Sequence, residues 1–124
     1  MHTVRFLARA AVLAAVMVAV GSVAACAHAI LVSSVPAAGA VVHDKGGRVM
    51  VRFNSRIDPV RSRLLLVRPD GVSTTLELTD DVPGRDTLTA TISELTPGAY
   101  RLRWQVLAID GHIARGDIPF TVAP

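Results

Sequence analysis

The sequence has little cysteine and few aromatic residues. Cys26 is its single cysteine, so no disulfide can form within one chain. A small domain without disulfides must be held together by its own apolar core. Aromatic residues make up only 4% of the chain, and no cluster of arginines and lysines is interleaved with them. That absence argues against a nucleic-acid-binding surface.

The balance of charges is close to even. The 13 basic and 10 acidic side chains give a formal charge of +3 at pH 7. Two of the basic residues, Arg5 and Arg9, lie near the N-terminus, and without them the formal charge falls to +1. A net charge this small does not indicate a particular charged partner.

The first 27 residues have the pattern of a secretory signal peptide. Arg5 and Arg9 precede an unbroken apolar run over residues 11–20, and small residues lead up to Ala27. These three regions are typical of a signal that is cleaved, here after Ala27. A transmembrane anchor is the alternative, but the run is short for a span of about 20 residues, and no charged flank follows it.

Cleavage after Ala27 divides the chain into a signal peptide, 1–27, and one exported domain, 28–124. The domain would keep 97 of the 124 residues, enough for a single modest core. Residues 23–26 also resemble a bacterial lipobox, in which cleavage precedes the cysteine and lipid is attached to it. In that case Cys26 would anchor a lipoprotein, and His28 would lie inside the chain without a free amine.

The pattern of apolar residues after position 28 is that of β-strands. Apolar and polar residues alternate with a period of two, which is typical of half-buried strands. Proline and glycine turn signals such as Pro69-Asp70-Gly71 and Thr96-Pro97-Gly98 separate the segments. Asp58-Pro59 is likewise expected to break the chain. The expected strands are 28–32, 48–54, 62–68, 73–79, 86–92, 99–107 and 115–122.

About seven short strands at this spacing predict an all-β fold, an immunoglobulin-like Greek-key β-sandwich or barrel. The segment 94–100 supports this class, because it resembles the entry to a late strand of such sandwiches. The hydroxyl of Tyr100 could then bond back to the backbone at the preceding corner.

Three residues are candidate metal ligands: His28, Asp110 and His112. Cleavage after Ala27 would make His28 the first residue, so that it offers both its α-amine and its imidazole. Asp110 and His112 are two residues apart, and such a pair in an extended chain points to one face. Three nitrogens and one carboxylate oxygen suit tetragonal Cu(II), whereas zinc prefers tetrahedral sites.

Each histidine also has a simpler interpretation. His43 lies in a polar loop that contains glycine, and we expect it to be exposed and not a ligand. Asp110-Gly111-His112 could be a plain Asp-Gly hairpin turn with an incidental histidine. The triplet alone does not decide between turn and ligand set, and the ligand interpretation depends on His28.

These segments together resemble the CopC family of bacterial copper-resistance and copper-carrier proteins. The resemblance covers essentially all of 28–124 and combines a histidine after the signal with a late Asp-Gly-His. The matching segments are 28–34 with Pro36 and Gly39, 49–53, 95–104, Asp110-Gly111-His112, Gly116 and 120–122. The resemblance implies an exported immunoglobulin-like domain that binds Cu(II) through His28, Asp110 and His112.

The chain also departs from the family pattern. Some members hold Cu(I) in a methionine-rich loop, but Met50 is the only methionine after the signal here. Soft Cu(I) selects several sulfur ligands, so a thioether site is not expected. Ala108 stands where the family often has a small hydroxyl residue.

The resemblance implies a periplasmic monomer that carries or sequesters copper. An inner-membrane copper transporter of the CopD type is a possible partner. A small copper-dependent oxidative enzyme is an alternative, but the domain is small and its four aromatic residues all alternate inward. A metal-free interaction module is a further alternative, because a fold alone does not define a function.

Overall fold

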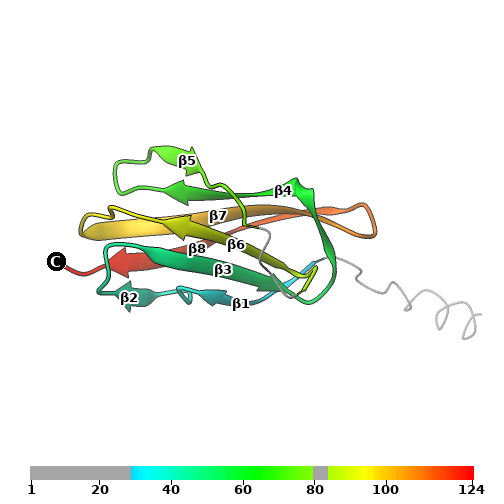
Figure 1. The fold of residues 1–124 in the computed structure, drawn as a ribbon, viewed down its shortest axis with the longest axis horizontal. Helices are drawn as coiled ribbons and strands as arrows, with labels where there is room; N and C mark the ends of the chain where they lie inside the picture. The colour runs from blue at the N-terminus through cyan, green and yellow to red at the C-terminus, as the bar shows by residue number, and fades with distance from the viewer. Residues whose placement is uncertain (1–28, 80–83) are drawn as a thin grey trace, which may run out of the picture.

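The computed structural model describes residues 29–79 and 84–124, which form eight β-strands in two sheets (Figure 1). The smaller sheet has the order β1-β3-β6, and the larger sheet has the order β2-β8-β7-β4-β5. The strands are β1 (Leu31–Val35), β2 (Ala40–Val42), β3 (Gly47–Phe53), β4 (Ile57–Val67), β5 (Ser73–Thr75), β6 (Thr87–Ile92), β7 (Gly98–Ala108) and β8 (Ile113–Val122). The predicted all-β, immunoglobulin-like fold class is confirmed.

The core lies between the apolar faces of the two sheets. In β7 the inward side chains from Tyr100 to Val106 are buried and Arg101, Arg103 and Gln105 point outward, as the alternation of the sequence predicts. Phe53 of the smaller sheet meets Trp104 of the larger one edge to face, with ring centroids 5.0 Å apart. Tyr100 and Phe120 stack at 5.5 Å within the larger sheet. Both contacts bury large apolar area, which is the main source of stability in a domain without a disulfide.

The corner near Tyr100 forms as predicted. The hydroxyl of Tyr100 donates a hydrogen bond of 2.8 Å to the carbonyl of Thr96 and accepts one of 3.1 Å from its amide. One buried side chain thus satisfies both polar groups of Thr96 and fixes the entry into β7.

Several strand boundaries differ from the prediction. The short β2 was not predicted, and it pairs in parallel with β8. Nothing local specifies a strand of three residues, so the pairing depends on β8. The strand predicted over 62–68 begins earlier, at Ile57, and runs through Pro59, which was expected to break the chain. The ladder between β4 and β7 is irregular between Asp58 and Arg63, and a proline is tolerated at such an irregularity.

Two other strands are shifted or shortened. β1 starts at Leu31 and continues to Val35, beyond the predicted end at residue 32. β5 ends at Thr75 after pairing with β4, and the chain beyond it crosses to the smaller sheet, where Leu78 forms an isolated bridge to Ala90 of β6. The predicted signal peptide, 1–27, and His28 lie outside the described residues, so their division from the domain stays a prediction. Within the described ranges no helix has the length and hydropathy to cross a membrane.

Candidate metal centre

The turn between β7 and β8 presents the Asp-Gly-His triplet. The amide of Gly111 donates to the carbonyl of Ala108 at 2.9 Å, and the amide of Ala108 donates to the carbonyl of His112 at 2.8 Å. Gly111 has a φ of 88°, a conformation that glycine adopts without strain. The backbone therefore forms a three-residue hairpin loop that glycine closes.

This turn brings the side chains of Asp110 and His112 together. Oδ1 of Asp110 accepts a hydrogen bond of 3.0 Å from the amide of His112. Its other oxygen, Oδ2, lies 3.1 Å from Nδ1 of the same histidine. The expectation that an extended chain would align the two residues was wrong in its reason, because a turn aligns them. The hairpin alternative is correct for the backbone, and it leaves ligation open.

The spacing of the two donor atoms is compatible with binding one ion. Donors about 2.0–2.1 Å from a metal and at right angles to each other lie about 2.9 Å apart, close to the 3.1 Å between Oδ2 and Nδ1. The side chain of His112 is 61% exposed and that of Asp110 is 22% exposed. An ion can therefore reach both groups from solvent.

A third donor is not present in the described part of the chain. No group of three histidine, cysteine, aspartate or glutamate side chains suited to a metal occurs there. Asp110 and His112 therefore make two donors of the predicted set. His28, the remaining predicted ligand, lies outside the described residues.

The beginning of the described chain lies at the same end of the sandwich as this turn (Figure 1). The amide of Ile30 donates to Oδ1 of Asn54 at 2.8 Å, and the amide of Asn54 donates to the carbonyl of Ile30 at 2.9 Å. Two residues beyond Asn54, the carbonyl of Arg56 accepts a 3.1 Å bond from the amide of Ile109. The segment after β3 thus contacts both the chain start and the turn.

Ser62 supports the end of β7, and sequence reasoning did not identify it. Its buried hydroxyl accepts a hydrogen bond of 3.1 Å from the amide of Leu107 and donates one of 2.6 Å to the carbonyl of Asp58. It therefore fills the gap in the ladder where β4 is irregular. A serine near a proline-containing stretch of a predicted strand is the only signal in the sequence, and it is weak.

The other residues considered for copper lie elsewhere. His43 is exposed, as expected, in the loop between β2 and β3. That loop is at the end opposite the turn (Figure 1). Met50 is half-buried in β3, and Ala108 is buried at the end of β7.

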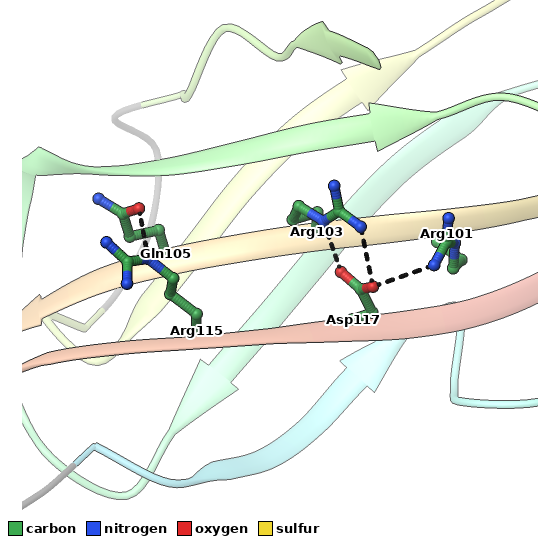
Figure 2. Close-up of polar contacts among 5 residues, drawn as sticks. All are labelled: Arg101, Arg103, Gln105, Arg115 and Asp117. Atoms are coloured by element: carbon green, nitrogen blue, oxygen red, sulfur yellow. Dashed lines mark hydrogen bonds and ion pairs between the residues drawn. The ribbon is translucent and has the colours of Figure 1, made fainter. Parts of the chain in front are cut away.

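A cluster of two arginines and one aspartate lies on the outer face of the larger sheet (Figure 2). Asp117 accepts hydrogen bonds of 2.9 and 3.2 Å from Arg103 and one of 3.3 Å from Arg101. The hydrogen bond from Arg103 holds the pKa of the Asp117 carboxyl below its usual value, and the same bond raises the pKa of Arg103. This cluster is separate from the Asp110–His112 turn.

The fold and the turn define a class: a small β-sandwich domain whose terminal hairpin presents a carboxylate beside an imidazole. The chain belongs to the CopC family, because the family's CopC domain matches residues 31–123. No curated protein matches the chain significantly.

Solved structures agree with this assignment. CopC from Methylosinus trichosporium OB3b is 29% identical, with a TM-score of 0.70, over 78% of this chain and 95% of that one. PcoC, a methionine-rich copper resistance protein from Escherichia coli, is 24% identical, with a TM-score of 0.59, over 77% of this chain and 98% of that one. The PcoC likeness supports the fold. Family membership gives the chain a copper-related function.

Proposed function

We propose that the protein binds one Cu(II) ion through His28, Asp110 and His112. His28 supplies its amine and imidazole, His112 an imidazole and Asp110 a carboxylate oxygen. Three nitrogens and one oxygen without a thiolate favour a tetragonal Cu(II) site. The role is that of a non-enzymatic monomer that sequesters or transfers copper in the periplasm as part of copper resistance.

The observation that carries this proposal is the contact between Asp110 and His112. Their donor atoms lie 3.1 Å apart on a turn that backbone hydrogen bonds close. The amide of His112 binds Oδ1 of Asp110, which orients the carboxylate and leaves Oδ2 toward the imidazole. Two donors held in this way lose little conformational freedom when an ion binds.

The position of the chain start also supports the proposal. His28 directly precedes Ala29, which is buried in the core. The backbone amide and carbonyl of Ile30 both form hydrogen bonds with Asn54, at the end of the sandwich where the turn lies (Figure 1). A free amine at His28 would therefore start from an anchored chain close to the other two ligands.

A copper-dependent oxidative enzyme, such as one that attacks polysaccharides, is the weaker candidate for two reasons. The four aromatic residues of the described chain, Phe53, Tyr100, Trp104 and Phe120, are buried, so they offer no flat surface to a polysaccharide. In addition, Asp110 would occupy a position that oxygen chemistry requires to be open. A metal-free interaction module would take up no stoichiometric copper.

The decisive experiment adds one residue before His28. A protein that starts at His28 is compared with one that carries a single preceding methionine, by Cu(II) titration against a competing chelator. The amide nitrogen of the extended protein is a poor donor, so we expect affinity to fall by orders of magnitude while circular dichroism stays unchanged. Equal affinity of the two proteins would rule out the amine of His28 as a ligand.

The processing of the exported protein is a separate measurement. Intact mass distinguishes a chain that begins at His28 from one that is lipidated at Cys26. A lipidated product would contradict the proposed amine ligand. Delivery to an inner-membrane transporter of the CopD type is part of the same proposal, and titration of the copper-loaded protein with that transporter would test it.

A further inference from the structure

A groove of about 630 Å³ runs beside the Asp110–His112 turn. Ile109 and Gly111 of the turn form one side of it, and its other lining residues include three arginines, Arg56, Arg61 and Arg85. A molecule in this groove would lie against the residues that flank Asp110. The groove is therefore placed to hold whatever exchanges an ion with the turn.

The groove carries excess positive charge. Among the lining residues that the structure describes, Asp58 is the single acidic one, and it lies 3.6 Å from Arg61. Arg56 and Arg85 are exposed, and no carboxylate among residues 29–79 and 84–124 comes within ion-pair distance of either. Two guanidinium groups thus remain to attract carboxylates, which they bind with two parallel hydrogen bonds.

The backbone holds these two arginines in place. The carbonyl of Arg56 accepts the amide of Ile109 at 3.1 Å, and the carbonyl of Arg85 accepts the amide of Ile57 at 2.9 Å. Because only the carbonyls make these bonds, the side chains can be changed while the frame of the turn stays intact.

Apolar side chains lie next to these charges. Ile109 is 72% exposed at the tip of the hairpin, and Pro59 lines the same groove. Apolar contacts inside a charged rim are typical of protein interfaces.

The arginines on the outer face of the larger sheet are engaged differently (Figure 2). Arg101 and Arg103 bind Asp117, and Arg115 donates a 2.9 Å hydrogen bond to Gln105. Asp117 partly compensates the charge of Arg101 and Arg103, and the guanidinium of Arg115 is held by Gln105. The groove is therefore the better docking surface for a partner in copper exchange.

We propose that this groove docks an acidic protein segment of the partner that exchanges copper with the turn. Carboxylates of that segment bind Arg56 and Arg85, and an apolar side chain covers Ile109. Charge attraction of this kind speeds association and fixes orientation, which would bring the partner's ligands to the metal. The inference rests on the proposed copper-binding function for its purpose.

The first test uses the copper-free protein. Two synthetic peptides are compared, one with glutamates around a central leucine and one with glutamines in their place. We expect the acidic peptide to shift the backbone amide NMR signals of Ile109 and Gly111, and added salt to weaken the effect. The glutamine peptide should produce no such shifts.

Matched variants separate the groove from general attraction to a basic protein. R56Q/R85Q removes two charges from the groove. R63Q/R115Q removes two from the outer face of the larger sheet, where exposed Arg63 and Arg115 lie near Arg103. We expect the first pair to weaken binding of the acidic peptide at least fivefold more than the second. Equal losses in both pairs, or equal binding of the two peptides, would overturn the proposal.

The second test follows copper transfer from the loaded protein. Both peptides carry the same histidine-containing copper-binding head, and transfer is recorded by stopped-flow absorbance. Electrostatic steering raises association rates by at least about tenfold, so we expect the acidic peptide to accept copper on the order of tenfold faster, and R56Q/R85Q to remove that advantage. Equal transfer rates to the two peptides would contradict docking.

The two proposals fail in different ways. If the acidic peptide binds at Ile109 and Gly111 but the protein takes up no copper, the copper function is wrong and the docking surface stands. If copper binds with the predicted ligands but the peptides behave alike, the docking proposal is wrong and the copper function stands.

Discussion

The end of the sandwich that holds Asp110 and His112, here called the turn end, is open to solvent and is ordered mainly by backbone hydrogen bonds. The opposite end, here called the corner end, is closed by buried side chains around Tyr100 and Leu95. Both ends contain a histidine, but of the two, His43 and His112, only His112 lies within ion-pair distance of a carboxylate of the described chain. The comparison separates two tasks: the corner end stabilises the fold, and the turn end presents donors.

The division follows from physical chemistry. A site that takes up and releases an ion must be reachable from solvent, and the side chains of Asp110 and His112 are partly exposed. It must also be fixed, and at the turn end backbone bonds to Ala108 and His112 provide this order without burial. His43 is exposed too, but among the described residues no ion pair to a carboxylate fixes its side chain, so it lacks the second requirement.

The largest expected effect sharpens this comparison directly. His112→Ala should reduce Cu(II) affinity by about 100-fold or more. Mutation of a residue that only hydrogen-bonds to a metal ligand commonly reduces metal affinity by about 10–100-fold, and loss of a ligand itself should reduce it at least as much. Asp110→Ala should cost less, since water can replace one carboxylate oxygen. His43→Ala is the matched control at the corner end and should change little. Competition titration would measure all three, and equal losses at His43 and His112 would refute the assignment of the turn.

Acidification should weaken copper binding next. Histidine must lose its proton before it binds a metal, and histidines ordinarily titrate between about pH 5 and 8. Lowering the pH from 7 to 5 should therefore reduce Cu(II) affinity by about tenfold or more, while circular dichroism shows an intact fold. A constant affinity over this range would argue against imidazole ligands.

A pair of hydroxyl deletions tests whether the two ends are separable. Ser62→Ala and Tyr100→Phe each remove a hydroxyl whose loss leaves half-buried backbone groups without their partner, which costs up to about 1–3 kcal/mol. Both should lower the free energy of unfolding in urea by similar amounts. Only Ser62→Ala should also weaken copper binding, by a few-fold, because Ser62 holds the strand that leads into the turn. A loss of copper affinity in Tyr100→Phe would show that the ends are coupled.

The smallest effect is expected at Asp117, which belongs to neither end. Hydrogen bonding from Arg103 lowers the pKa of its carboxyl in the folded protein. The ion pair therefore stabilises the fold above the carboxyl's ordinary pKa of about 3.9, and this contribution is lost as pH falls through the lowered value. Asp117→Asn should cost less than about 1 kcal/mol at neutral pH, since exposed pairs contribute little.

Two measurements check this last prediction. Urea unfolding of the wild type and Asp117→Asn at several pH values should show a difference that disappears in acid. Copper affinity should be the same in both proteins at neutral pH. A difference in stability that grows as pH falls would contradict the assigned role of the Arg103 contact.

Local signals in the sequence were sufficient to predict those features of the fold that depend on neighbouring residues. The alternation of β7 follows from period-two burial. The corner at Tyr100 follows from a local hydroxyl hydrogen bond, and the turn at Gly111 from the positive φ that glycine adopts easily. The pairing of β2 with β8 was missed because three residues carry no pattern of their own. Pro59 was expected to end a strand, but an irregular ladder accommodates it.

For the candidate site, the spacing of Asp110 and His112 was enough to predict that their side chains lie close together, whereas their role as ligands depended on His28 and stays a prediction. The sequence also determined the all-β class, because alternation and turn residues are properties of neighbouring positions. Only the tertiary structure decided that a closed hairpin turn aligns the two side chains, and that Ser62 and the carbonyl of Arg56 support it. These contacts join residues far apart in the chain, and their geometry exists only after the sheets have packed.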